Sequence, residues 1–167
     1  MQERLHMVEE AMRDYFGADQ RRVDHALRVT GFAEEILRQE KGDRLVVITA
    51  ALLHDIGIRE AERKYGSSAG NLQESEGPPV AREILSVLRF DETVIAEVCE
   101  IIASHHSPGE VDTDNFRVIW DADWLVNLGD EFDLRDAAKT RDLIRNIFQT
   151  ATGKAIAELL FLPGGGA

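Results

Sequence analysis

The residues best suited to chemistry in this sequence are histidines with carboxylates close by. His54 and Asp55 are adjacent and follow the apolar run VVITAALL. A charged pair at the end of such a run needs a partner or a metal ion, because burying an unpaired charge is energetically unfavourable. Imidazole nitrogens and carboxylate oxygens are ligands that divalent ions accept. Gly57 lets the chain turn after the pair, so both side chains can point at one ion.

The order of these residues along the chain resembles the HD superfamily of metal-dependent phosphohydrolases. In that family a histidine on an early helix precedes a His-Asp pair at the end of an apolar helix, and an aspartate follows much later. Here the early histidine is His25 in VDHALRV, the pair lies in AALLHDIG, and the later aspartate is Asp123 in DADWLVN. The resemblance covers roughly residues 20–130.

The resemblance implies one divalent ion, with Mn, Mg, Co, Ni, Zn and Fe all open as its identity. Its implied ligands are His25, His54, Asp55 and Asp123. Asp121 is the weaker candidate for the last position, because the family ligand is the aspartate that follows Ala122.

The pair His105-His106 leaves open whether a second ion binds. This segment, IIASHH, resembles the helix that supplies extra histidines in two-metal members of the family. Those members carry another histidine where this chain has Gln73, so a second ion needs Glu74 or Glu76 in its place.

Three residues are predicted to contact the substrate. Arg63 and Lys64 follow the metal pair and can bind phosphate, although a solvated helix face explains them equally well. Asn127 resembles an asparagine that contacts the nucleotide in alarmone hydrolases. It lies four residues after Asp123, so both side chains share one helix face.

Two groups of side chains have competing interpretations. Three arginines within a turn of His25 can bind phosphate or, as the sequence favours, act as counter-ions for Asp24. They are Arg21, Arg22 and Arg28. Four aromatic residues around Asp123 can stack on a nucleobase, but their helical spacing favours core packing. They are Phe116, Trp120, Trp124 and Phe132.

The predicted activity is hydrolysis of a phosphate ester in a nucleotide or a related small molecule. A metal-bound water has a lowered pKa and can attack phosphorus. Asp55 can accept its proton, and His105 or His106 can act as a general acid. Two alternatives stay open: a di-iron oxygenase of the same superfamily, and a non-catalytic sensor that binds a nucleotide and a metal.

The hydrophobic pattern predicts an all-α, single-domain bundle of five to seven helices over residues 1–162, followed by a disordered Gly-rich tail at 163–167. The expected helices span residues 2–16, 20–41, 44–56, 79–88, 91–105, 115–128 and 136–162. The Gly-, Ser- and Pro-rich stretch 66–79 is expected to be irregular and to cover a site.

The composition restricts the partners. Of 167 residues, 44% are apolar, and the formal net charge is −12, which argues against a large nucleic-acid surface. A small phosphorylated ligand needs only a local positive patch, which a bound metal can supply. The longest apolar run is too short to cross a membrane, and the charged first helix is unlike a signal peptide. A cytoplasmic location is therefore predicted, and the oligomeric state stays open.

Overall fold

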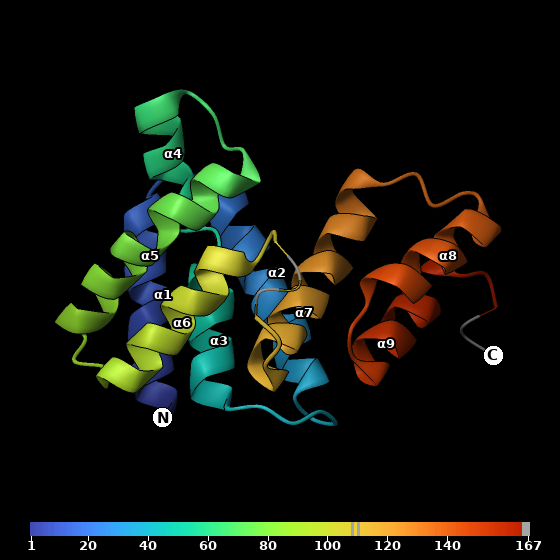
Figure 1. The fold of residues 1–167 in the computed structure, drawn as a ribbon, viewed down its shortest axis with the longest axis horizontal. Helices are drawn as coiled ribbons and strands as arrows, with labels where there is room; N and C mark the ends of the chain where they lie inside the picture. The colour runs from blue at the N-terminus through green and yellow to red at the C-terminus, as the bar shows by residue number, and fades with distance from the viewer. Residues whose placement is uncertain (108, 110, 165–167) are drawn as a thin grey trace.

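Every regular element of the computed structural model is a helix within the residues that the structure describes, which are 1–107, 109 and 111–164 (Figure 1). The nine helices of this part of the chain are α1 (Gln2–Phe16), α2 (Gln20–Ile36), α3 (Arg44–Leu53), α4 (Ile58–Tyr65), α5 (Gly70–Val87), α6 (Glu92–Ser104), α7 (Asp114–Glu131), α8 (Ala137–Ile147) and α9 (Ala151–Phe161). The all-α class is confirmed. The number of helices exceeds the expected five to seven, because residues 136–162 form two helices and α4 is a helix of its own.

The prediction of an irregular stretch over residues 66–79 is wrong for residues 70–79, which are helical, and holds for residues 66–69. Helix α5 begins at Gly70 and contains both Pro78 and Pro79. It packs along α6 and also against α4, where Gly57 and Gly77 lie so close that a Cβ on Gly57 would meet the backbone of Gly77. Tertiary packing of this kind overrides the helix-breaking tendency of proline. At the end of the chain Pro163 and Gly164 form a turn, while residues 165–167 of the predicted tail lie outside the described residues.

Helix α3 is the centre of the bundle. Eight of its ten residues, Val46 to Leu53, are buried, and the helix packs against α1, α2, α6 and α7. Asp43 caps its beginning by accepting a hydrogen bond from the backbone N–H of Leu45 at 2.8 Å. No helix in the described part of the chain is both long and apolar enough to cross a membrane.

The helices that carry the candidate site surround the C-terminal end of α3. Helix α2 packs against both α3 and α7, and α6 packs against α3. Helices α8 and α9 lie on the outer side of α7, away from α3 (Figure 1). His25 on α2, His54 after α3, His105 after α6 and Asp123 on α7 therefore come from four elements around one point.

Asp121 joins α7 to the beginning of α9. Its fully buried carboxylate accepts hydrogen bonds from the backbone N–H of Gln149 at 2.8 Å and from the backbone N–H and hydroxyl of Thr150 at 2.7 and 2.6 Å. The Thr150 hydroxyl in turn accepts a bond from the N–H of Gly153 at the first turn of α9. A Cβ on Gly153 would collide with the Asp121 carboxylate. Asp121 is therefore a structural anchor and not a metal ligand.

Replacing Asp121 by Ala is expected to lower the free energy of unfolding by about 3 kcal/mol, because three donors lose a charged acceptor and two of them are buried. Urea denaturation followed by circular dichroism measures this loss. The matched control is Asp112→Ala, which removes an exposed ion pair to Arg117 and should change stability by less than about 1 kcal/mol. Equal losses in the two variants would contradict the anchoring role.

Candidate metal centre

His54 is held in one tautomer by the end of its own helix. It is the C-terminal cap of α3 and is completely buried. Its Nδ1–H donates to the carbonyl of Ala51 at 2.7 Å, one of the carbonyls that a helix end leaves unpaired. This bond leaves Nε2 facing the centre of the bundle, the arrangement typical of a metal-ligating histidine whose other nitrogen is fixed by a carbonyl.

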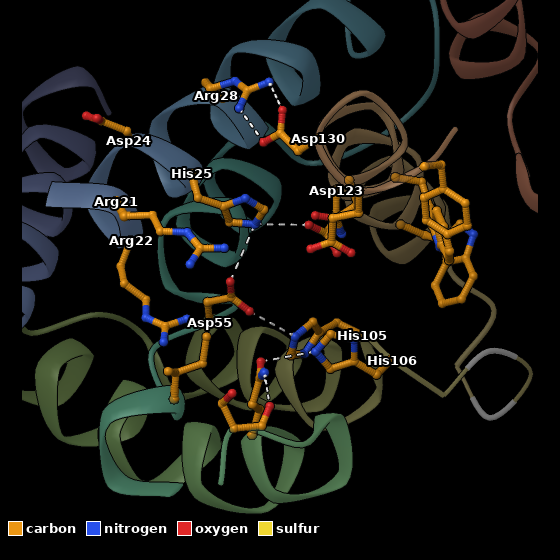
Figure 2. A pocket seen from close by; sticks show the side chains of 18 residues that line it. Arg21, Arg22, Asp24, His25, Arg28, Asp55, His105, His106, Asp123 and Asp130 are labelled. Atoms are coloured by element: carbon orange, nitrogen blue, oxygen red, sulfur yellow. Dashed lines mark hydrogen bonds and ion pairs between the residues drawn. The ribbon is translucent and has the colours of Figure 1, made fainter. Parts of the chain in front are cut away.

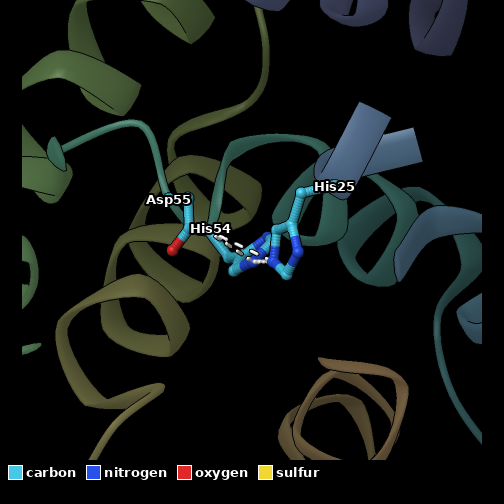
Figure 3. A group of neighbouring side chains, drawn as sticks. All are labelled: His25, His54 and Asp55. Carbon is cyan, nitrogen blue, oxygen red and sulfur yellow. Dashed lines mark hydrogen bonds and ion pairs between the residues drawn. The ribbon is translucent and has the colours of Figure 1, made fainter. Parts of the chain in front are cut away.

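Two imidazoles and two carboxylates converge at this point (Figures 2 and 3). His25 Nε2 lies 3.1 Å from His54 Nε2, 3.2 Å from Asp123 Oδ1 and 3.4 Å from Asp55 Oδ2. His54 Nε2 lies 3.5 Å from each of the same carboxylate oxygens. Ligands about 2.0–2.2 Å from a common ion are separated by about 3–3.5 Å. The structure thus brings the four predicted ligands to distances that one ion can bridge.

Two atoms of this cluster are buried without a hydrogen-bond partner among the described residues. They are Asp123 Oδ1 and His105 Nε2. Buried polar atoms in native proteins are nearly always satisfied, so an orphaned carboxylate oxygen beside two imidazoles indicates a cation. The C-terminal ends of α3 and α6 also meet the cluster, since His54 and His105 cap them. The negative ends of helix dipoles favour a positive charge there.

The protonation states of the residues in this cluster depend strongly on one another. Burial lowers the pKa of His54, but the carboxylates of Asp55 and Asp123 outweigh it and raise that pKa to about 9. Burial likewise opposes ionisation of Asp55 and Asp123, yet the neighbouring imidazoles hold both carboxyl pKa values well below the usual range. Both carboxylates are therefore ionised near neutral pH, and His54 carries a proton that a divalent ion can displace.

A second group of ligands shares Asp55 with the first. Asp55 Oδ1 lies 3.4 Å from His105 Nε2, and the Nδ1–H of His105 donates to Ile102 at 2.7 Å, as His54 does to Ala51. Asp55, His105 and His106 offer ligand atoms within 4.8 Å of one another. The aspartate can therefore face two positions at once.

Gln73 contacts the His106 ring of this second group, whereas the carboxylates of Glu74 and Glu76 are bonded elsewhere. The Gln73 amide donates to the carbonyl of Ser68 at 2.7 Å, so its oxygen accepts the Nε2–H of His106 at 3.1 Å. Glu74 instead accepts bonds from the backbone N–H of His106 and the hydroxyl of Ser107. Glu76 is paired with Lys64 and Tyr65. Neither glutamate is therefore placed to replace the imidazole, which was the condition for a second ion.

A cavity of about 880 Å³ opens over the ligand cluster, and Asn127 lines it as predicted. Arg63 and Lys64 are not among its lining residues. Arg63 pairs with Glu60 on its own helix, and Lys64 pairs with Glu76 on α5. The structure therefore does not bring the two predicted phosphate ligands to the site.

Three arginines of α2 line the cavity in their place (Figure 2). They are Arg21, Arg22 and Arg28. The signal was present in the sequence, since these residues lie four and three positions before and three after His25 and share its helix face. They are not counter-ions of Asp24, whose carboxylate accepts a bond from Gln20 at 2.7 Å.

The three arginines differ in their partners. Arg28 makes a bidentate pair with Asp130 of α7 at 2.6 and 3.0 Å, and Arg22 pairs with Glu62 at 2.8 Å. Arg21 has no ion pair within the described residues, and its guanidinium points toward the ligand cluster (Figure 2). Arg21 is thus the cation most available to an anionic ligand.

The aromatic residues of α7 divide between core and cavity. Phe116 is buried in the core, and Trp120 is nearly buried with its indole N–H donating to Ile147 at 2.9 Å. Trp124 and Phe132 are more exposed than Trp120, and all three line the cavity. The preference for core packing is therefore wrong for Phe132, whereas Trp124 packs partly against the core and also faces the cavity.

Comparison with known proteins agrees with this geometry. The family model described as HD domain matches residues 22–128. The chain belongs to the HD-domain family. The crystal structure of a predicted HD superfamily hydrolase from an uncultured Thermotogales bacterium is similar to it, with a TM-score of 0.62 and 33% sequence identity over 95% of this chain and 83% of that one. No curated protein matches the chain. The resemblance noted in the sequence is thereby confirmed. The matched residues include all four proposed metal ligands, which are His25, His54, Asp55 and Asp123.

Replacing His54 by Ala is expected to reduce bound divalent metal from about one ion per chain to near zero, because the variant loses a ligand locked in place by its backbone bond. Elemental analysis of the purified protein measures the metal. His6→Ala is the control, since His6 is exposed and pairs only with Glu10. Retention of the metal by the His54 variant would contradict the ligand assignment.

Stability of the metal-free protein is expected to fall as pH rises. The folded-state pKa of His54 is about 9, above its ordinary 6.5, so its stabilising contribution is complete below about pH 6.5 and is lost as pH rises through 9. Urea denaturation with chelator at pH 6.5 and 9.5 should show a loss of about 2–3 kcal/mol. Saturating metal should reduce the loss, because the ion replaces the proton. An equal loss in a His54→Gln variant would refute this origin.

Proposed function

We propose that this HD-domain protein is a metal-dependent phosphohydrolase that cleaves a phosphate ester of a nucleotide or a related small phosphorylated metabolite. The observation that supports this most strongly is the convergence of His25, His54, Asp55 and Asp123 below a cavity lined by arginines. These four residues would hold the ion. When bound, a divalent ion lowers the pKa of a water molecule and neutralises charge on a phosphoryl oxygen.

Asp55 and His105 are suited to move the protons. Asp55 is ionised and directs one oxygen to each ligand group, so it can orient the attacking water and accept its proton. His105 Nε2 is held 3.4 Å from Asp55 by the bond from Nδ1 to Ile102, so a proton on Nε2 can pass to the leaving oxygen. His106 is less suited, because its Nε2–H is engaged by Gln73 and burial lowers its pKa.

Arg21 is the residue that we assign to the phosphate. It lies one turn before His25 on α2, and it is free of ion pairs within the described residues. A guanidinium binds phosphate oxygens bidentately. The overall charge of −12 disfavours a polymeric nucleic acid, whereas a cavity of about 880 Å³ is of the size that holds a small molecule.

A di-iron oxygenase is the second candidate, because Asp55 is shared with a second group of possible ligands, His105 and His106. The non-catalytic sensor is the third. Loading the protein aerobically with Fe²⁺ separates the first two, since an oxygen-activating pair of irons gives a visible absorption band. Turnover of a phosphate ester separates both enzymes from the sensor.

The metal-loaded protein is expected to release inorganic phosphate from at least one member of a panel of nucleoside monophosphates and sugar phosphates. Mn²⁺, Co²⁺, Mg²⁺, Ni²⁺ and Zn²⁺ should each be tested, and chelation or the His54→Ala change should abolish release. Phosphate release that persists in both cases would overturn the proposal. The absence of any release, together with an iron-dependent visible band, would favour the oxygenase.

Two arginine variants give this experiment a matched comparison. Arg21→Ala should raise KM about tenfold or more through the loss of charge-assisted hydrogen bonds. Arg63→Ala should leave KM unchanged, because Arg63 pairs with Glu60 outside the cavity. The opposite result would restore the assignment first made from the sequence.

A further inference from the structure

Two aromatic rings lie together on the wall of the cavity. The ring centroids of Trp124 and Phe132 are 5.8 Å apart, and their planes are inclined by 54°. Phe132 is 39% exposed, immediately after the end of α7. Large apolar side chains that face a cavity are typical of ligand sites, and their flat faces suit a planar ring.

Trp124 is half-buried and packs beside Trp120, whose ring centroid is 6.0 Å away. Trp120 is fixed by the bond from its indole N–H to the carbonyl of Ile147. The indole N–H of Trp124 has no hydrogen-bond partner in the part of the chain that the structure describes. The indole N–H of Trp120 is already bonded to Ile147, so although both tryptophans line the cavity, only that of Trp124 is free to bond a ligand among the described residues.

The aromatic pair is close to the metal centre along one helix. Trp124 directly follows the ligand Asp123, and Asn127 lies one turn further on the same side. At about 1.5 Å of rise per residue, Phe132 is about 13 Å beyond Asp123 along the helix. Asn127 lies between the two ends and offers both an amide donor and an acceptor.

The charges on the cavity wall are unevenly distributed. Arg21 and Arg22 are on α2, next to His25. The aromatic end has Asp130 and Glu131 instead, and the cavity-lining Arg28 pairs with Asp130. A ligand with an anionic group at one end and a neutral, flat group at the other matches this distribution.

We propose that Trp124 and Phe132 form the platform that binds a nucleobase, and that the substrate class is therefore the nucleoside monophosphates. The phosphate lies at Arg21 and the metal ligands, the sugar passes Asn127, and the base stacks on Trp124 with Phe132 against its edge. The assignment rests on the proposed phosphohydrolase function, because that function places the phosphate.

Adenosine, AMP and ribose 5-phosphate are the probes that test the platform. The chain contains two tryptophans, so Trp120→Phe leaves Trp124 as the only tryptophan, whose emission can be excited separately from that of tyrosine. Adenosine and AMP should quench its emission and ribose 5-phosphate should not. Quenching by ribose 5-phosphate alone, or by none of the three, overturns the platform.

Calorimetric titration of variants measures the contribution of each ring. Trp124→Leu should weaken AMP binding about tenfold or more while leaving ribose 5-phosphate unchanged, because base–aromatic stacking is lost. Phe132→Ala should act in the same direction, and Trp124→Phe should restore most of the affinity. Phe161→Leu is the matched control, since this ring of α9 packs on α7 at Gly129, outside the cavity.

The outcomes separate the platform from the activity. Equal affinities of the wild type for AMP and ribose 5-phosphate, or equal losses in Trp124→Leu, overturn the platform even if metal-dependent phosphate release stands. Adenosine binding that depends on Trp124, without phosphate release from any ester, supports the platform and overturns the phosphohydrolase. The same calorimetry on Phe161→Leu must give wild-type affinities, and a tenfold loss there would overturn the assignment to Trp124.

Discussion

Burying His54 at the end of α3 imposes the constraint on which the rest of the site depends. An imidazole that is fully buried and bonded to Ala51 through one nitrogen must find a partner for the other. The fold supplies it by directing His25, Asp55 and Asp123 to the same point. Two anionic carboxylates cannot be held there without positive charge, which a proton provides in the metal-free state and a divalent ion provides better.

This constraint also explains why the ligands lie at the ends of helices. His54 and His105 cap α3 and α6, and each donates to the carbonyl three residues earlier. One bond in each case satisfies a free carbonyl, fixes the tautomer and aims the second nitrogen inward. The ring orientation is thus set by backbone hydrogen bonds, which is a rigid way to prepare a metal site before the ion arrives.

The helices that hold the ion also supply the residues that face the substrate cavity. Helix α2 supplies His25 and, one turn earlier, Arg21, while α7 supplies Asp123 and then Trp124 and Asn127. Each helix therefore carries a metal ligand and a substrate-facing group in neighbouring positions. Packing α2 against α7 assembles both parts of the site in one step, and the pair between Arg28 and Asp130 joins the two helices at its margin.

The sequence alone determined the helical class, the family and the four residues that meet at the centre. These rest on local features: an apolar run that must be buried, a His-Asp pair at its end, and a strict order of ligands along the chain. Features that depend on contacts between residues far apart in the sequence could not be predicted from such local patterns. Only the tertiary structure showed that α5 runs through Pro78 and Pro79, because packing against α4 and α6 decides that helix.

Packing between helices also decides which side chains reach the cavity and which do not. In the sequence Arg21 and Arg63 look alike, because each lies on a polar helix face near a proposed metal-ligating residue. Arg63 is turned toward Glu60, whereas Arg21 lines the cavity, which α2 and α7 border together. Likewise the spacing of Trp120 and Trp124 indicated a helix face but not what covers it. Local pattern determines which side chains share a face, and only the arrangement of neighbouring helices decides whether that face meets the core, the solvent or a ligand.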